Sequence, residues 1–155
     1  MTERPYPGGI DCLWLATDRN GHCGAFVTGG EGPVPVQLLL DVGIQVEDIG
    51  ALVCYLPVST SARMLVSMKR PDDFMDLATR GFFVYDWSDV HRVSSKCIHA
   101  YEPIAVPVNP ITLDKLPDAL VEIAKTAKFS DVEFADSQLL DVREHASCRD
   151  GTKLD

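Results

Sequence analysis

The chain has 155 residues, of which 46% are hydrophobic, so it can form one domain whose core needs neither disulfides nor a metal. Asp and Glu total 23 against 14 Lys and Arg, and the formal net charge at pH 7 is −9. This acidity argues against a nucleic-acid-binding protein and against docking on an anionic membrane, because both need a basic face.

The sequence carries no pattern of a secreted or membrane protein. Its N-terminus has no apolar signal-peptide core, and every apolar stretch is interrupted before the roughly 18 residues that a membrane span needs. The five cysteines are odd in number and scattered in spacing, unlike the framework of a disulfide-rich secreted domain. We therefore expect a cytoplasmic protein with reduced thiols.

The clearest local pattern is a β-hairpin, which follows a Pro- and Gly-rich stretch over residues 1–10 that we expect to be loose. Two apolar runs flank Asn20–Gly21, a dipeptide typical of the two-residue type I′ turn, whose central positions need positive φ. This turn predicts a register in which Trp14 faces Val27 across the two strands.

Helical spacing of apolar residues dominates the next part of the chain. Residues 36–55 predict two short helices or one broken helix, with Glu47 and Asp48 in the first turn of the second, where the helix dipole favours acidic side chains. Ala51–Leu56 remains open as a buried strand, since so short an apolar run has no decisive period.

Two further helical segments are predicted from their ends. Ser59–Ser61 can cap a helical stretch over 62–68. Pro71–Asp73 is typical of a helix start, because proline suits the first position and acids complement the dipole. Gly81 is typical of the C-terminal cap of that helix.

Strand patterns follow. Gly81–Trp87 is rich in aromatic residues and predicts a strand, as does Lys96–Tyr101. Pro103, Pro107 and Pro110 then predict an edge strand or a covering strap, because proline cannot donate to a sheet.

The last third of the chain predicts one strong helix. Pro117–Asp118 begins the best amphipathic helix of the sequence. A short strand is expected at Val132 and Phe134, followed by a loose tail over 147–155. The order of elements predicts a single α+β domain over 1–155, with a mostly antiparallel sheet, an N-terminal β-hairpin and several short helices.

Cofactor motifs are missing from the sequence. The Gly-rich stretch Gly29–Pro33 lacks the Lys-Ser/Thr of a phosphate-binding loop, and Glu31 would repel a phosphate. His22–Cys23 and Cys97-x-His99 are the tightest His/Cys pairs, and neither has the spacing of a zinc knuckle. We therefore expect no cofactor and no metal.

A cysteine-dependent enzyme is one alternative. Cys97 could act as a nucleophile with His91 or His99 as its base and Asp89 as the orienting acid. On a regular strand, however, Cys97 and His99 would lie about 6–7 Å apart, too far for direct proton transfer.

A mixture of aromatic and charged residues offers a recognition surface. Asp86, Trp87, Asp89, His91 and Arg92 are the residues that we expect to contact a partner, with Glu31 at the rim. Tryptophan supplies rigid contact area and the charges steer association. A half-buried strand end would have the same composition.

Three stretches resemble small bacterial proteins, among them immunity-type proteins of polymorphic-toxin systems: Trp14–His22, Gly30–Pro35 and Tyr85–Arg92. Immunity proteins act by occlusion, so the resemblance implies no catalytic residue and a toxin as the partner. A basic toxin would be steered toward an acidic protein.

Three hypotheses about function therefore stand. The first is a protein-interaction module that binds another protein, in the manner of an immunity protein. The second is the small cysteine-dependent enzyme. The third is a homo-oligomeric structural or regulatory protein, for which a homodimer is the simplest assembly.

Overall fold

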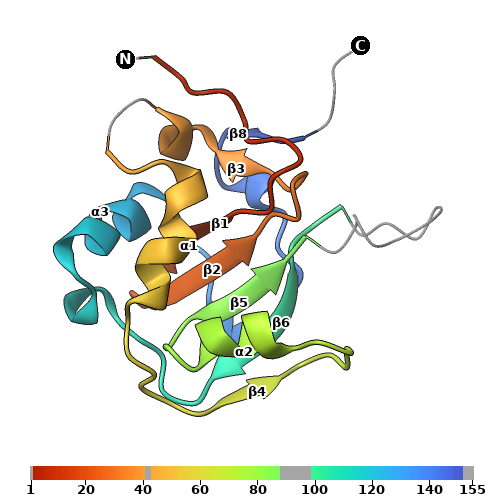
Figure 1. Ribbon diagram of the computed structural model, residues 1–155, viewed down its shortest axis with the longest axis vertical. Coiled ribbons are helices and arrows are strands. Elements are labelled where there is room, and N and C mark those ends of the chain that lie inside the picture. The colour runs from red at the N-terminus through yellow and green to blue at the C-terminus, as the bar shows by residue number, and fades with distance from the viewer. Residues whose placement is uncertain (1, 41–42, 88–98, 152–155) are drawn as a thin grey trace.

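The predicted hairpin forms the middle of a six-stranded sheet in the computed structural model, which describes residues 2–40, 43–87 and 99–151. The strand order is β4-β6-β5-β2-β1-β7 (Figure 1). These strands span Leu13–Asp18 (β1), Cys23–Val27 (β2), Ala62–Met64 (β4), Phe83–Asp86 (β5), Glu102–Pro107 (β6) and Lys128–Phe129 (β7). The β1/β2, β5/β6 and β4/β6 pairs are antiparallel, whereas β2/β5 and β1/β7 are parallel. The α+β single-domain prediction is confirmed, with a sheet that is mixed.

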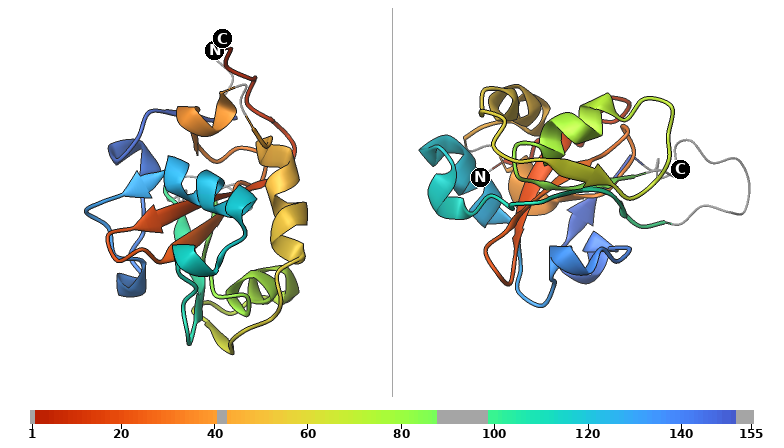
Figure 2. Two further views of the ribbon diagram at one scale, coloured as in Figure 1. Left: turned by 90° about the vertical axis from the view of Figure 1, so that its left-hand side faces the viewer. Right: turned by 90° about the horizontal axis from the view of Figure 1, so that it is seen from below.

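Helices cover one face of this sheet and the C-terminal segment covers the other (Figure 2). The helices are α1 (Val46–Cys54), α2 (Asp72–Ala78) and α3 (Asp118–Thr126). Short 3₁₀ turns lie at Val36–Leu39 (η1), Leu113–Lys115 (η3), Phe134–Asp136 (η4) and Val142–Glu144 (η5). In the described part of the chain, no helix is long and apolar enough to cross a membrane.

The three helices begin where the sequence predicts them. Glu47 and Asp48 lie in the first turn of α1, and Pro71 is the N-cap of α2. Leu120 and Ile123 are buried on the apolar face of α3. Ala51–Leu56, which the sequence left open as a strand, belongs largely to α1.

Aromatic stacking holds the other face of the sheet. The rings of Trp14 and Phe26 stack at 4.3 Å, and those of Phe26 and Tyr85 at 4.8 Å, because these residues pair directly across three adjacent strands. Tyr101 and Phe134 pack edge-on against this stack. Such geometry contributes about 0.5–1.5 kcal/mol per pair beyond area burial.

The predicted hairpin register is wrong by one residue. Trp14 pairs with Phe26 rather than with Val27, because the turn contains three residues instead of two. The buried carboxylate of Asp18 accepts hydrogen bonds from the backbone N–H groups of Asn20 and His22 and so fixes this longer turn. Gly21 has a φ of 76° and takes the left-handed position of a three-residue hairpin loop.

The prediction of a helix over 62–68 is also wrong, since this stretch begins with strand β4. Ala62–Met64 pairs antiparallel with β6, so tertiary pairing overrides its local helical pattern. Strand β6 in turn lies inside the sheet, not at the edge that its prolines predict. A register shift opposite Val84 and Tyr85 accommodates Pro103 within the β5/β6 pair.

Three predictions for the second half of the chain differ from the structure or concern residues outside the described ranges. Phe134 belongs to η4 rather than to a strand. The tail is fixed in part, because Cys148–Arg149 (β8) pairs with Val34–Pro35 (β3). Of the predicted strand 96–101, residues 96–98 lie outside the described ranges, and Tyr101 makes an isolated bridge to Leu140.

Candidate functional site

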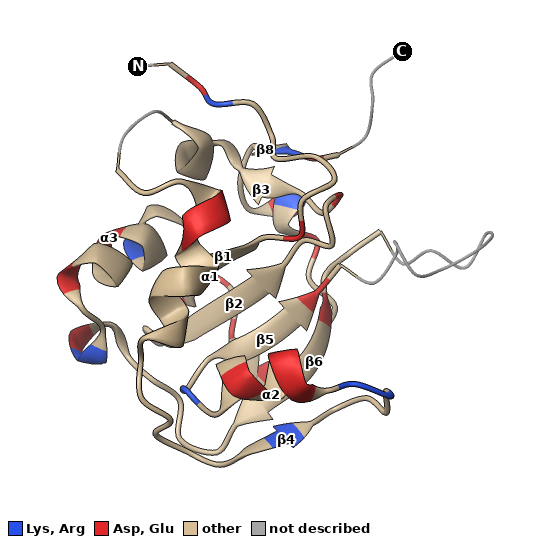
Figure 3. Ribbon diagram, viewed as in Figure 1, with Lys and Arg blue, Asp and Glu red and all other residues tan. Residues whose placement is uncertain are grey.

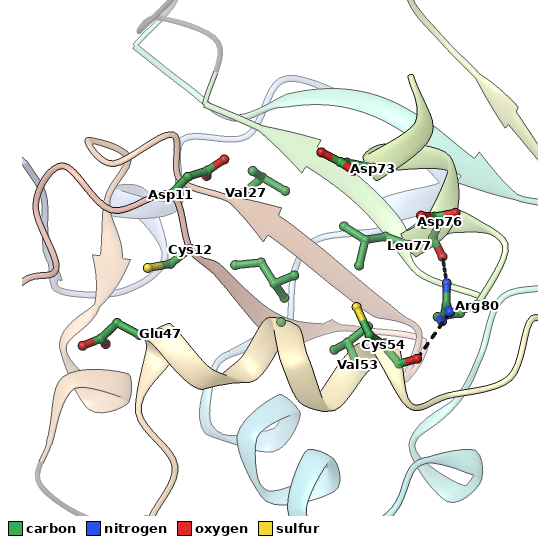
Figure 4. Close-up of a pocket in the computed structure, with 12 residues that line it drawn as sticks. Asp11, Cys12, Val27, Glu47, Val53, Cys54, Asp73, Asp76, Leu77 and Arg80 are labelled. Atoms are coloured by element: carbon green, nitrogen blue, oxygen red, sulfur yellow. Dashed lines mark hydrogen bonds between the residues drawn. The ribbon is translucent and has the colours of Figure 1, made fainter. Parts of the chain in front are cut away.

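A groove lies between α1 and α2 on the helix-covered face of the sheet (Figure 4). We call it the α1–α2 groove, and its volume is about 270 Å³. The described residues that line it are Asp11, Cys12, Leu13, Val27, Glu47, Gly50, Val53, Cys54, Asp73, Asp76, Leu77 and Arg80.

The floor of the groove is apolar. Leu13 and Val27 face each other across β1 and β2, and Val53 and Leu77 contribute from the two helices. Directly paired residues of neighbouring strands share one face, which places Leu13 and Val27 beneath the helices. The floor therefore offers a site for an apolar side chain of a ligand.

The rim is acidic. Asp11 and Glu47 lie on one side of the groove and Asp73 and Asp76 on the other, with Val27 and Leu77 between them (Figure 4). Figure 3 shows acidic residues on the ribbons of both helices. Asp11 accepts a hydrogen bond from the Gly29 N–H. The other three rim carboxylates form no hydrogen bond or ion pair with a described residue.

The one cation in this lining, Arg80, is held by backbone carbonyls. Its guanidinium donates to the carbonyl oxygens of Leu56 at 2.9 Å, Asp76 at 2.7 Å and Cys54 at 3.4 Å. These bonds link the C-terminal ends of α1 and α2. Arg80 therefore fixes the shape of one end of the groove and is not paired with a rim carboxylate.

A glycine widens the groove in the middle of α1. Gly50 has no positive φ, and a Cβ atom there would meet Leu13 at 3.5 Å, an ordinary van der Waals distance. Glycine inside a helix costs about 1 kcal/mol relative to alanine. The fold does not require glycine at this position, so the observed residue is better explained by the open space that it leaves over Leu13.

The lining presents four carboxylates, two thiols and one guanidinium as its polar groups. It contains no histidine, lysine or hydroxyl side chain among the described residues. Burial, together with the negative charges of Glu47 and Asp11, raises the pKa of the Cys12 thiol to about 11. A thiol that stays protonated at neutral pH is a poor nucleophile. Nor do the described ranges contain a group of three or more His, Cys, Asp or Glu that could hold a metal ion.

Two of the sequence-predicted contact residues are buried. Trp87 is 6% exposed and packs against Tyr101, with the ring centroids 5.3 Å apart, and the guanidinium of Arg143 lies 5.8 Å from its ring. Its ring therefore belongs to the core. Asp86 is also 6% exposed and pairs with Val27, which places it beside the floor of the groove.

The predicted rim residue, Glu31, is exposed. The next residue, Gly32, lies against Trp87, and a Cβ atom added at Gly32 would meet the Trp87 Cβ at 2.8 Å. The structure thus brings the Glu31 loop and Trp87 together, and the tryptophan supplies packing there.

Four of the remaining predicted residues lie outside the described part of the chain: Asp89, His91, Arg92 and Cys97. His99 is described: it is exposed and has a φ of 58°. The cysteine-dependent enzyme therefore stays a prediction.

Sequence reasoning missed the groove. In the sequence, Asp73 is explained as a complement of the helix dipole, and nothing in the spacing places it or Asp76 opposite Asp11 and Glu47. One signal was available: Gly50 interrupts the middle of a strongly apolar helical pattern. Comparison with known proteins adds nothing to this, since no family model, curated protein or solved structure matches the chain.

Proposed function

We propose that the chain is a protein-interaction module whose α1–α2 groove binds a basic, partly apolar segment of another protein. The observation that carries the proposal is the apolar floor beneath a rim with four carboxylates and one cation, Arg80, that is occupied by backbone carbonyls. Aliphatic parts of a ligand would lie on Leu13 and Val27, and its Lys or Arg side chains would reach the rim.

The position of the acids supports a ligand role. The helix dipole accounts for Glu47 and Asp73, which lie in the first turns of α1 and α2. It does not account for Asp76, because this residue lies in the last turn of α2, where the dipole disfavours a negative charge. A cationic partner would offset that cost.

The class of partner follows from the resemblance to immunity-type proteins. We propose that the partner is a basic toxin, which the net charge of −9 would steer toward this surface. Occlusion by binding needs no catalytic group, in keeping with the lining of the groove. The segment around Asp89, His91 and Arg92, with Glu31, is retained as a predicted second region of contact.

A binding measurement with a defined probe tests the proposal. The probe is a fluorescein-labelled 12-residue peptide of lysine and leucine, titrated with protein at 0.15 M salt, where charges more than about 8 Å apart are largely screened. The double variant E47K/D73K should bind it about tenfold more weakly than the wild type, because two rim attractions become repulsions.

A matched control isolates the groove from the overall charge. Asp48 and Asp72 lie in the same first helical turns as Glu47 and Asp73 but do not line the groove, so D48K/D72K changes the net charge by the same amount. This control should bind the peptide within about twofold of the wild type. Equal weakening in both double variants would mean that only net charge matters and would refute a binding site in the groove.

A further inference from the structure

We infer that the binding surface continues past Arg80 onto an apolar patch, so that the partner's segment carries basic residues at one end and an aromatic or aliphatic anchor at the other. This inference rests on the proposed function, since it extends the same site. We call the second part the Tyr55 patch and define it by three exposed residues, Tyr55, Val58 and Val108, each of which is next in the chain to a residue that lines a neighbouring cavity.

Most of the large hydrophobic side chains that are exposed in the described part of the chain belong to this patch. Tyr55 is 86% exposed, Val58 64% and Val108 62%. Among the described residues, only Ile10 and Leu139 are further large hydrophobic side chains classed with them as exposed. Exposed apolar groups that gather in one place are typical of protein-binding surfaces.

A cavity of about 310 Å³ lies beside the patch, because each patch residue is next in the chain to a residue that lines it. Its described lining residues are Leu56, Pro57, Ser59, Asn109, Pro110, Ile111 and Lys115. Cavities of this size, with mostly apolar walls, accept a single large side chain from a partner.

Hydrogen bonds hold the two sides of the patch together. The Val108 N–H donates to the Ser61 carbonyl at 2.9 Å, and the Asn109 N–H donates to the Thr60 hydroxyl at 2.9 Å. On the first loop, the N–H groups of Ser59 and Thr60 both donate to the carbonyl of Thr79. The patch is therefore preformed, which lowers the entropic cost of binding.

Arg80 joins the patch to the groove. Cys54 lines the groove and Leu56 lines the patch cavity, and the Arg80 guanidinium donates to the carbonyl oxygens of both. The two cavities thus meet at one short turn of chain. A single extended segment of a partner can contact both.

The charges give this segment a direction. The rim of the groove is acidic, whereas Lys115 is the charged residue among those that line the patch cavity. A Lys or Arg side chain would be attracted to the groove and repelled at the patch. The anchor over the patch is therefore apolar, and the basic residues precede or follow it.

Extended peptides test the inference. The lysine–leucine peptide is compared with two versions that carry Trp-Leu-Phe at the N-terminal or the C-terminal end. One of the two should bind the wild type about tenfold more tightly than the parent peptide. In the variant Y55S/V58S this gain should disappear, while the affinity for the parent peptide stays unchanged. The side chains are exposed, so an unchanged Tm should accompany the loss.

Two exposed apolar residues elsewhere provide the control. I10S/L139S removes side chains of 53% and 55% exposure and should keep the full gain. Absence of any gain, or its loss in I10S/L139S too, would overturn the patch but leave the groove intact. Failure of the parent peptide to bind would overturn the proposed function as well. A wild-type dimer in sedimentation that Y55S/V58S dissociates would assign the patch to a second copy and overturn the inference.

Discussion

The Nε–H of Arg80 donates a hydrogen bond to the carbonyl oxygen of Leu56 at 2.9 Å, across the gap between α2 and the end of α1. The guanidinium also donates hydrogen bonds to the carbonyl oxygens of Asp76 and Cys54, at the ends of the two helices, where carbonyl groups lack partners within the helix. One side chain thereby fixes the spacing of the two helices that form the groove.

Removal of this side chain should loosen the fold. We expect R80A to lower the free energy of unfolding by about 2 kcal/mol, because three hydrogen bonds are lost, one of them partly buried. R63A, which removes an exposed arginine of β4, should change it by less than about 0.5 kcal/mol. Urea denaturation of both variants checks the prediction, and an equal loss in the two would contradict the role given to Arg80.

Alanine at Gly50 should separate stability from binding. G50A should raise the free energy of unfolding by about 0.5–1 kcal/mol, since alanine is the better helix former and its Cβ fits at 3.5 Å from Leu13. The same methyl group would occupy the floor of the groove and weaken peptide binding severalfold. Urea denaturation and fluorescence anisotropy measure the two effects, and tighter binding by G50A would count against the groove.

The carboxylate of Asp18 ties the hairpin turn to the C-terminal segment. Besides the two turn N–H groups, it accepts a hydrogen bond from the Phe134 N–H at 2.9 Å. D18N should cost about 2 kcal/mol of stability, because an amide cannot accept all three bonds and a buried donor is left unpaired. D136N alters an exposed carboxylate nearby and should be almost neutral. Thermal unfolding would contradict this account if the two Tm values matched.

Buried thiols should make the protein less stable in alkali. Burial raises the pKa of Cys148 to about 11 from the usual 9.0. The folded state therefore keeps a proton that the unfolded state loses above pH 9, and the free energy of unfolding falls as the pH rises from 9 to 11. We expect C148A to lose about 1 kcal/mol less than the wild type over this range, a discounted value because the thiol is only half-buried. Parallel pH curves for the two proteins would disprove the assignment.

The elements with strong local patterns are the ones that the sequence predicts well. The hairpin strands and α3 follow from alternation and helical spacing, which tertiary contacts merely reinforce. The predicted hairpin register is wrong because the observed one depends on the Asp18 carboxylate. The third hydrogen bond of this carboxylate, from Phe134, joins residues far apart in the chain. Strand β4 is missed for a similar reason, since Ala62–Met64 is extended only because it pairs with β6.

The groove could not be predicted from spacing. Its lining comes from the loop before β1, from β1 and β2 and from two helices, and the β2/β5 parallel pairing brings α2 beside α1. Trp87 is a second case in which the sequence pattern misleads. A tryptophan among charged residues looks like a contact residue, but Tyr101 and Gly32 enclose it.

The most direct test of the account is to map the bound peptide on the protein. In ¹⁵N-labelled protein titrated with the lysine–leucine peptide, we predict saturable shifts of the backbone amide signals of Leu13, Val27, Gly50 and Leu77, all of which line the groove. Lys125 and Lys128, which line a cavity at the end of α3, should not shift. Saturable shifts confined to Asp89, His91 and Arg92, with the groove signals unmoved, would contradict the central claim that the α1–α2 groove is the binding site.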